Sequence, residues 1–166
     1  LDRLSRAVYM CELVDSFSEE HSASYQLYRL LVESMTALCT ASDPWLLVRH
    51  FEAQLLTVAG FRPELGLCVE CGNELTPADH VFDVSSGGVV CPDCSPQGLS
   101  AVLPIQLNAM KVLRLLQRKR SFASVEGVRI PPPVVHDVER LLTTHIRYVV
   151  ERTLKSADFV RQVSEL

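Results

Sequence analysis

Four of the six cysteines form two C-x2-C pairs, a residue type and spacing that could bind a metal ion. They are Cys68, Cys71, Cys91 and Cys94, with nineteen residues between the pairs. Two such turns can complete a tetrahedron of thiolates around Zn²⁺ at Zn–S distances of about 2.3 Å. Both turns have suitable residues, because Gly72 can adopt the positive φ needed after the first pair and Pro92 fixes φ at the start of the second. We therefore expect one Zn²⁺ per chain.

The segment between the two pairs predicts a β-hairpin. Val81, Phe82 and Val84 precede the turn at residues 85–88, and Val89 and Val90 follow it. A zinc ribbon spanning 66–98, of roughly 30 residues, is too small to fold on apolar burial alone, so we expect the metal to stabilise it. Four thiolates leave no coordination position for water or substrate, so the ion is expected to be structural and not catalytic.

Three other uses of the four cysteines fit less well. Two disulfides would suit a secreted protein, but the sequence has no recognisable export signal. A redox C-x-x-C site needs one motif, whereas the motif here is duplicated across a hairpin. An iron–sulfur cluster also takes four cysteines, although these spacings favour a single ion. His80 lies beside the ribbon, but with four cysteines available it is not expected to be a ligand.

The elements that position the ribbon are predicted to be helical. Apolar residues recur at intervals of three and four before and after the cysteines. Asp43 and Pro44 mark the start of one helix, and Gly60 marks its end. The expected helices cover residues 2–16, 22–41, 44–59, 104–119, 133–155 and 156–163, the last capped by Ser156. The fold class is therefore mainly α, a helical bundle over residues 1–166 that the ribbon with its short β-hairpin interrupts.

Other residues capable of chemistry lie on apolar helical stripes and are expected to be structural. Cys11 and Cys39 are interpreted as small buried hydrophobic residues. His145 is interpreted as a core histidine with its hydrogen bonds made. The sequence has no glycine-rich phosphate loop, no G-x-S-x-G motif and no metal-binding His/Glu pair on one helix. An enzyme is therefore the least favoured class of function.

Charge is distributed unevenly along the chain. Residues 1–99 hold 5 Lys and Arg against 14 Asp and Glu, while residues 100–166 hold 11 against 6, and the two parts give the net charge of −4. Such asymmetry fits a surface for an anionic partner, or a basic and an acidic face that pair within the fold. Composition alone does not decide between these two explanations.

The segment KVLRLLQRKR (111–120) holds five basic residues and no acidic one. Its first three basic residues fall in one sector of a helix, and the last two complement the dipole at the helix end. A solvated stripe explains this pattern, and so does an edge that binds DNA phosphate or an acidic peptide tail between Leu113 and Leu116. The candidate residues for nucleic-acid or acidic-tail binding are Lys111, Arg114, Arg118, Lys119, Arg120, Arg140 and Arg147, the last two on the outer face of the long helix.

The order of these features resembles the RecO family of bacterial recombination mediators. The resemblance is carried by LLTVAGFRP directly before the first cysteine pair, by FDVSSGGVVCPDC and by LLTTHIRYVVERTLKSADFV, and it covers nearly the whole chain. It implies a non-catalytic role in DNA repair in the bacterial cytoplasm, at the nucleoid. The implied activities are binding and annealing of single- and double-stranded DNA, and contact with the acidic tail of single-stranded-DNA-binding protein and with RecR for RecA loading. Some family members lack the cysteines, which agrees with a structural metal.

The same resemblance implies an N-terminal OB-fold domain before this chain, which opens in helical periodicity without an initiator methionine. Without that domain we expect weak DNA binding. The rival hypothesis is a zinc-ribbon module of transcription or translation whose helices dock another protein. No membrane span is expected.

Overall fold

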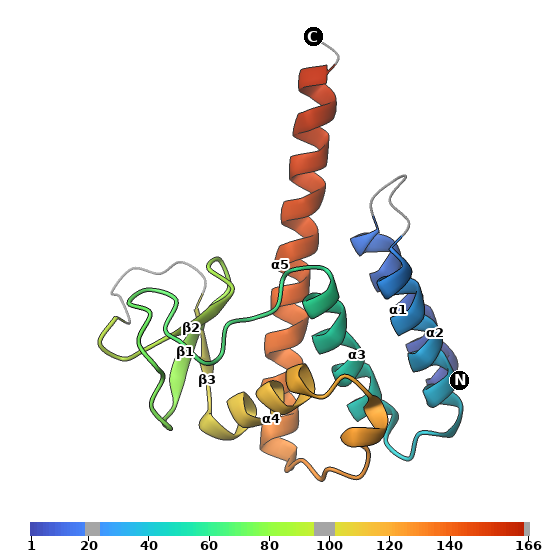
Figure 1. The fold of residues 1–166 in the computed structure, drawn as a ribbon, viewed down its shortest axis with the longest axis horizontal. Coiled ribbons are helices and arrows are strands. Elements are labelled where there is room, and N and C mark those ends of the chain that lie inside the picture. Colours follow the sequence, from blue (N-terminus) through green and yellow to red (C-terminus); the bar gives the residue numbers. More distant parts are fainter. Residues whose placement is uncertain (19–23, 95–101, 165–166) are drawn as a thin grey trace.

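The computed structural model describes residues 1–18, 24–94 and 102–164, which form a helical domain with one small sheet. The helices are α1 (Asp2–Phe17), α2 (Tyr25–Thr40), α3 (Pro44–Val58), α4 (Leu107–Arg118) and α5 (Pro132–Ser164), with the short 3-10 helix η1 (Phe122–Ser124). The strands are β1 (His80–Asp83), β2 (Gly88–Val90) and β3 (Val102–Ile105). In Figure 1, α5 stands between the sheet on one side and the α1–α2 pair on the other. The predicted class, mainly α with a small β element, is confirmed.

Local sequence signals set the starts of two helices. The Asp43 carboxylate accepts a hydrogen bond from the Leu46 N–H at 3.0 Å, and Pro44 occupies the first helical position of α3. Ser24 caps α2 in the same way. The helix begins at Tyr25, directly after this cap, and the expected residues 22 and 23 lie outside the described part of the chain.

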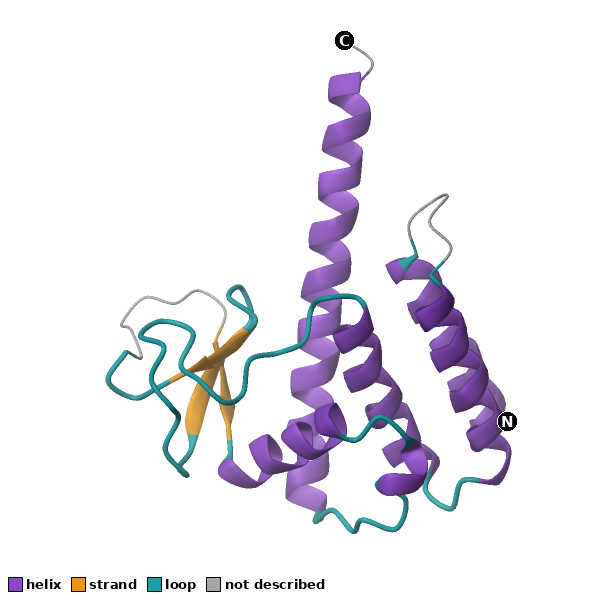
Figure 2. Cartoon of the chain, viewed as in Figure 1, coloured by secondary structure: helices purple, strands orange, loops and turns teal. Residues whose placement is uncertain are grey.

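One hydrophobic core joins the helices to the sheet. Phe51 of α3, Phe82 of β1 and Leu116 of α4 are all fully buried in it. Helix α3 is buried from Leu46 to Leu56, polar residues included, because it packs against α1, α2, α4 and α5. Figure 2 shows the strands gathered beside this helical body. The ribbon is thus part of the domain core and not a separate appendage.

A buried ion-pair network ties α1 and α5 to α3. Arg49 pairs with Glu52 at 2.9 Å and with Glu139 of α5 at 3.3 Å. The Tyr9 hydroxyl of α1 donates to Glu52 at 2.6 Å. Burial raises the pKa of the Glu52 carboxyl to about 7, against the attraction of Arg49 and the hydrogen bond from Tyr9. The network therefore fixes three helices relative to one another.

The segment before α4 differs from its prediction. Residues 102–105 form a strand, where a helix was expected to begin at residue 104. β3 pairs with β1 in a sheet of order β2-β1-β3, so it lies at an edge. An edge strand tolerates Pro104, which has no N–H to donate. Residues 95–101, which include the end of the expected ribbon at residue 98, lie outside the described residues.

The long C-terminal helix is continuous. Residues 133–155 and 156–163 were expected to form two helices, but α5 runs unbroken from Pro132 to Ser164. No glycine or proline falls between residues 134 and 164, so nothing in the sequence requires an interruption. Within the described residues, no helix is both long and apolar enough to cross a membrane.

The prediction that Cys11 and Cys39 are buried is wrong. Both are exposed. Cys11 continues an outward stripe of α1 that contains Leu4 and Val8, whereas the buried side of that helix carries Met10 and Leu13. Helical periodicity identifies an apolar stripe, but it cannot decide which of two stripes faces the core.

Candidate metal centre and basic surface

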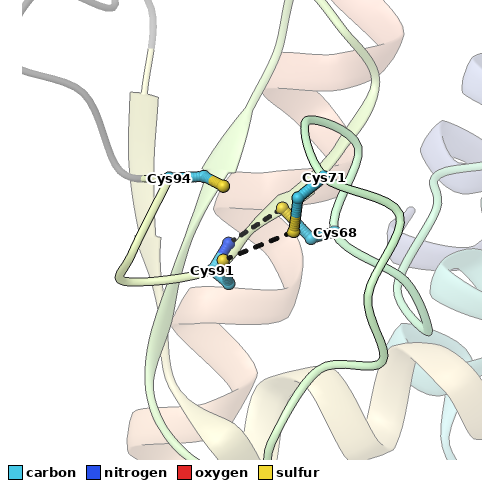
Figure 3. Close-up of side chains that lie close together, drawn as sticks. All are labelled: Cys68, Cys71, Cys91 and Cys94. Carbon is cyan, nitrogen blue, oxygen red and sulfur yellow. Dashed lines mark hydrogen bonds between the residues drawn. The ribbon is translucent and has the colours of Figure 1, made fainter.

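The four cysteines of the two pairs converge at one point beside the sheet (Figure 3). Their sulfur atoms all lie within 4.8 Å of one another. The Cys71 and Cys91 sulfurs are 3.9 Å apart, close to the edge of about 3.8 Å in a tetrahedron with Zn–S bonds of 2.3 Å. The arrangement can therefore hold one metal ion with four sulfur ligands.

Short turns present these sulfurs. In the first turn, the Gly72 N–H donates to the Cys68 carbonyl at 2.8 Å, and Gly72 has the predicted positive φ of 75°. In the second turn, the Cys94 N–H donates to the Cys91 carbonyl at 3.1 Å. The Cys91 N–H also points at the Cys68 sulfur at 3.3 Å, which links the two turns. Backbone geometry thus preorganises the ligand set.

The electrostatics of the cluster fit a cation. Burial raises the pKa of the Cys68 thiol, but N–H donors from Cys71, Cys91 and Glu70 outweigh it and bring the value down to about 6. Hydrogen bonding to the Cys71 and Cys91 sulfurs raises the pKa of the Cys94 thiol to about 12, and burial and repulsion between thiolates add to this effect. A divalent cation removes that repulsion and allows all four to ionise.

His80 takes no part in the sulfur cluster. Its Nε2 lies 2.8 Å from the Thr76 carbonyl oxygen, so this nitrogen donates to the backbone. Among the residues that the structure describes, the metal-binding group consists of the four cysteines alone. The expectation that His80 is not a ligand agrees with this geometry.

The linker between α3 and the first cysteine is held by side chains of the helices. Each of three alternate carbonyls accepts a hydrogen bond from a different long side chain. The pairs are His145 Nε2 with Phe61 O (3.0 Å), Gln117 Nε2 with Pro63 O (3.0 Å) and Arg114 Nε with Leu65 O (2.8 Å). On its other edge the linker pairs with β2, where Glu64 N–H donates to Gly87 O and Val89 N–H donates to Glu64 O. The linker therefore fastens the ribbon to α4 and α5.

Two expectations for the basic segment change as a result. The Arg114 guanidinium is half-buried beneath the linker and donates to the Leu65 carbonyl, so it does not lie on a fully solvated stripe with Lys111. Leu113 and Leu116 are 1% and 0% exposed, and they offer no notch for a ligand side chain. Three other apolar residues of α4 are partly buried and pack against the same core, namely Leu107, Val112 and Leu115.

The remaining predicted basic residues lie in different surroundings. Lys111, Arg118 and Arg147 are exposed. Lys119 is exposed and follows α4, and its carbonyl accepts hydrogen bonds from His50 at 2.6 Å and from Gln54 at 3.1 Å. Arg140 donates to the Pro104 carbonyl at 2.7 Å and pairs with Asp137 at 3.2 Å, which links α5 to β3.

Arg120 borders two adjoining hollows between α2, α3 and η1. Their volumes are about 260 and 430 Å³, and both are lined by Leu30, Glu33 and Arg120. Arg29 lines the larger one and pairs with Glu33 at 3.2 Å. The sequence did not identify Arg29, because it is an isolated cation in the acidic half of the chain. The two hollows, called the Arg120 groove below, combine apolar and polar side chains with two arginines and with Glu33.

His145 lies in the core as predicted, but only one of its two ring nitrogens has a partner among the described residues. It is buried in the core, its Nε2 donates to the Phe61 carbonyl, and its ring meets that of Phe82 edge-on at 5.5 Å. Burial lowers the pKa of His145, and the hydrogen bond only partly opposes this effect. The residue is therefore a neutral structural histidine.

Comparison with known proteins gives one consistent result. The family described as "Recombination protein O C terminal" matches residues 1–158. A DNA repair protein RecO of Dehalococcoides mccartyi is 34% identical over 150 residues, which cover 90% of this chain and 58% of that protein. Proteins of the same name from a Roseiflexus species and from Symbiobacterium thermophilum are each 36% identical, over 100% and 96% of this chain. The chain spans less than two thirds of the length of these relatives. It covers 58% of the Roseiflexus protein and 64% of the Symbiobacterium protein.

Proposed function

Because the chain belongs to the recombination protein O C-terminal family, we propose that it is a DNA-repair and recombination module that works by binding and not by catalysis. In this proposal it helps to bind and anneal single- and double-stranded DNA. It also contacts the acidic tail of single-stranded-DNA-binding protein and RecR, and so assists RecA loading. Its place of action is the bacterial cytoplasm, at the nucleoid. These are activities of whole proteins, whereas the chain spans less than two thirds of the length of these relatives.

The use of the buried ionisable groups supports binding over catalysis. His50 and His145 each donate to a backbone carbonyl, and Glu52 is enclosed by Arg49 and Tyr9. Each of these groups has a partner that positions helices or the linker.

The metal of the cysteine cluster is proposed to be Zn²⁺ with a structural role. Four cysteine sulfurs at these separations suit a tetrahedral zinc site, and four protein ligands close the coordination shell. When bound, the ion supplies bonds to sulfur and offers no open position to a substrate. Binding of a partner is therefore assigned to the helices.

The Arg120 groove is proposed to receive the acidic tail. An acidic peptide that ends in an aromatic residue needs an apolar hollow with cations at its edge. The larger hollow offers the apolar Leu30 and Val58 together with Arg29 and Arg120. A guanidinium can bind a carboxylate with two parallel hydrogen bonds. This combination of shape and charge is the observation that carries the proposal.

Fluorescence anisotropy with a labelled acidic peptide ending in phenylalanine tests the groove. We expect Arg120→Gln and Arg29→Gln each to weaken binding about tenfold, the effect of losing one charge-assisted hydrogen bond. Arg129→Gln is the matched control, because Arg129 is exposed and does not line the groove. Equal affinities for all three variants would show that the tail binds elsewhere, and an absence of binding by the unaltered chain would refute the tail contact.

A further inference from the structure

A third hollow lies where the ribbon meets α5. It is formed by the linker at residues 60–62, the β1–β2 turn at residues 84–87 and α5 from His145 to Arg152. Its volume is about 180 Å³. It shares no lining residue with the Arg120 groove and contains none of the four cysteines. It therefore belongs neither to the metal centre nor to the proposed tail site.

The charged residues of this hollow are both cationic. Arg62 and Arg152 line it, and no acidic residue does so among the described residues. Arg62 contacts Gln117 only through Nε, at 3.4 Å, and Arg152 also has an interaction within the protein. Asp83 lies behind the turn, buried, and its Oδ1 accepts hydrogen bonds from the Ser85 N–H and hydroxyl at 2.9 and 2.7 Å. No carboxylate lines the hollow among the described residues, although Arg62 also attracts the nearby Glu64 carboxylate, whose pKa is lowered first by the hydrogen bond from the Gly66 N–H.

The inner wall carries an unused hydrogen-bond acceptor. His145 is 3% exposed, and because Nε2 donates to the Phe61 carbonyl, Nδ1 of the neutral ring is an acceptor. No partner for Nδ1 is present among the described residues. Gly87, with φ of 68°, lies beside this ring, and a Cβ there would meet the Cε1 atom at 3.4 Å. Glycine therefore leaves room at the ring, and an N–H or O–H of a ligand would satisfy the nitrogen.

Aromatic surface completes the hollow. Phe61 is 40% exposed, and its ring packs on Phe17 with centroids 6.1 Å apart. Tyr148 is half-buried and lines the same hollow. An exposed aromatic ring beside arginines is the combination that binds an unpaired base together with its phosphate, because every base can stack and every phosphate pairs with a guanidinium.

We propose that this hollow binds one nucleotide of single-stranded DNA, with its phosphate at Arg62 and Arg152 and its base against Phe61. The inference rests on the proposed DNA-binding function. It adds a contact where the ribbon meets the helices, separate from the exposed residues Lys111, Arg118 and Lys119, called the basic end of α4. The metal then acts indirectly, because it stabilises the ribbon whose β1–β2 turn forms one wall.

Amide chemical shifts of the ¹⁵N-labelled chain, titrated with a single-stranded oligothymidylate, test the site. We expect shifts at residues 84–87 and 145–152. In parallel binding assays, Arg62→Gln and Arg152→Gln should each lower the slope of log K against log salt by about one, as for one lost phosphate contact. Arg129→Gln, which does not line the hollow, should leave those shifts unchanged. Retained circular dichroism confirms that each variant is folded.

The outcomes separate this inference from the function it rests on. Strand binding that shifts only residues of α4 would overturn the nucleotide site and leave the DNA-binding proposal standing. No strand binding at any residue would overturn both. A titration with inorganic phosphate is the second arm. Shifts in the hollow with phosphate but none with the strand would assign it to a free phosphate ion and overturn DNA as the source.

Discussion

Arg114 shows how a side chain of the basic segment can be committed to structure. Its guanidinium donates to the Leu65 carbonyl, one of the three contacts that hold the linker. Arg114→Met keeps the aliphatic part of the side chain and leaves that carbonyl without its partner. We expect the free energy of unfolding to fall by about 1–3 kcal/mol, as measured by urea denaturation. Lys111→Met, at an exposed position of the same helix, should change it by less than about 0.5 kcal/mol, and equal effects would refute the structural role of Arg114.

His145 links stability to pH. Burial lowers the pKa of His145 below its value of 6.5 in the unfolded chain, so the unfolded state binds the proton more readily. The stability contributed by the neutral ring is therefore fully present above pH 6.5 and is lost as the pH falls through the folded pKa. Burial acts on His50 in the same direction, against its hydrogen bond to Lys119.

The matching substitution is His145→Gln, whose amide can still donate to the Phe61 carbonyl but does not titrate. We expect thermal unfolding of this variant to depend less on pH below 6.5 than that of the unaltered chain. His145→Leu removes both the proton and the donor, so it should be less stable at every pH. An identical pH dependence in the unaltered chain and the glutamine variant would contradict the assignment.

At the scale of elements, β2 depends on a glycine. A Cβ on Gly88 would lie 2.3 Å from the Val69 Cγ1 atom and 3.0 Å from the Glu64 backbone oxygen. Gly88→Ala should therefore separate the linker from the sheet and lower the free energy of unfolding by about 1–3 kcal/mol. Gly66→Ala is the control, because its Cβ would meet only one side-chain atom, Glu64 Oε1, at 3.2 Å. The free energies of unfolding are measured by urea denaturation. If both variants lost the same amount, the close contacts of Gly88 would not explain its effect on stability.

The metal-binding turns and the hairpin were predictable because their signals are local. Two C-x2-C pairs, Gly72 and the Ser85–Gly88 turn each define geometry within a few residues. The third strand was missed because Pro104 before an apolar helix is typical of a helix start, and only pairing with β1 makes those residues a strand. The prediction of which side of α1 is buried was wrong for a related reason. It carries apolar residues on two sides, and only its packing against α2 and α3 selects one of them.

The candidate surface was less predictable than the metal centre. Five cations in ten residues marked α4, but the contact of Arg114 with the linker is a long-range feature that the sequence does not contain. Arg29, Arg62 and Phe61 have no local signature. They became candidates only because the fold places them around hollows.

At the scale of the whole molecule, DNA binding by the basic end of α4 predicts a salt effect. Lys111→Gln, Arg118→Gln and Lys119→Gln remove exposed charges. We expect each to lower the slope of log K against log salt by about one if the residue contacts a phosphate, for single- and double-stranded DNA of any sequence. Arg129→Gln again serves as the control. Slopes that stay unchanged in all three variants would show that DNA does not bind at this end of α4.

We assign the stability of the ribbon to the metal and the binding of the acidic tail to the helices. The most direct test titrates the acidic peptide into protein from which a chelator withdraws the metal stepwise, with released zinc and helical circular dichroism measured in the same samples. We predict one zinc ion per chain and a peptide affinity that stays within about threefold while the helical signal is retained. An affinity that fell in proportion to the zinc released, at constant helical signal, would contradict the claim.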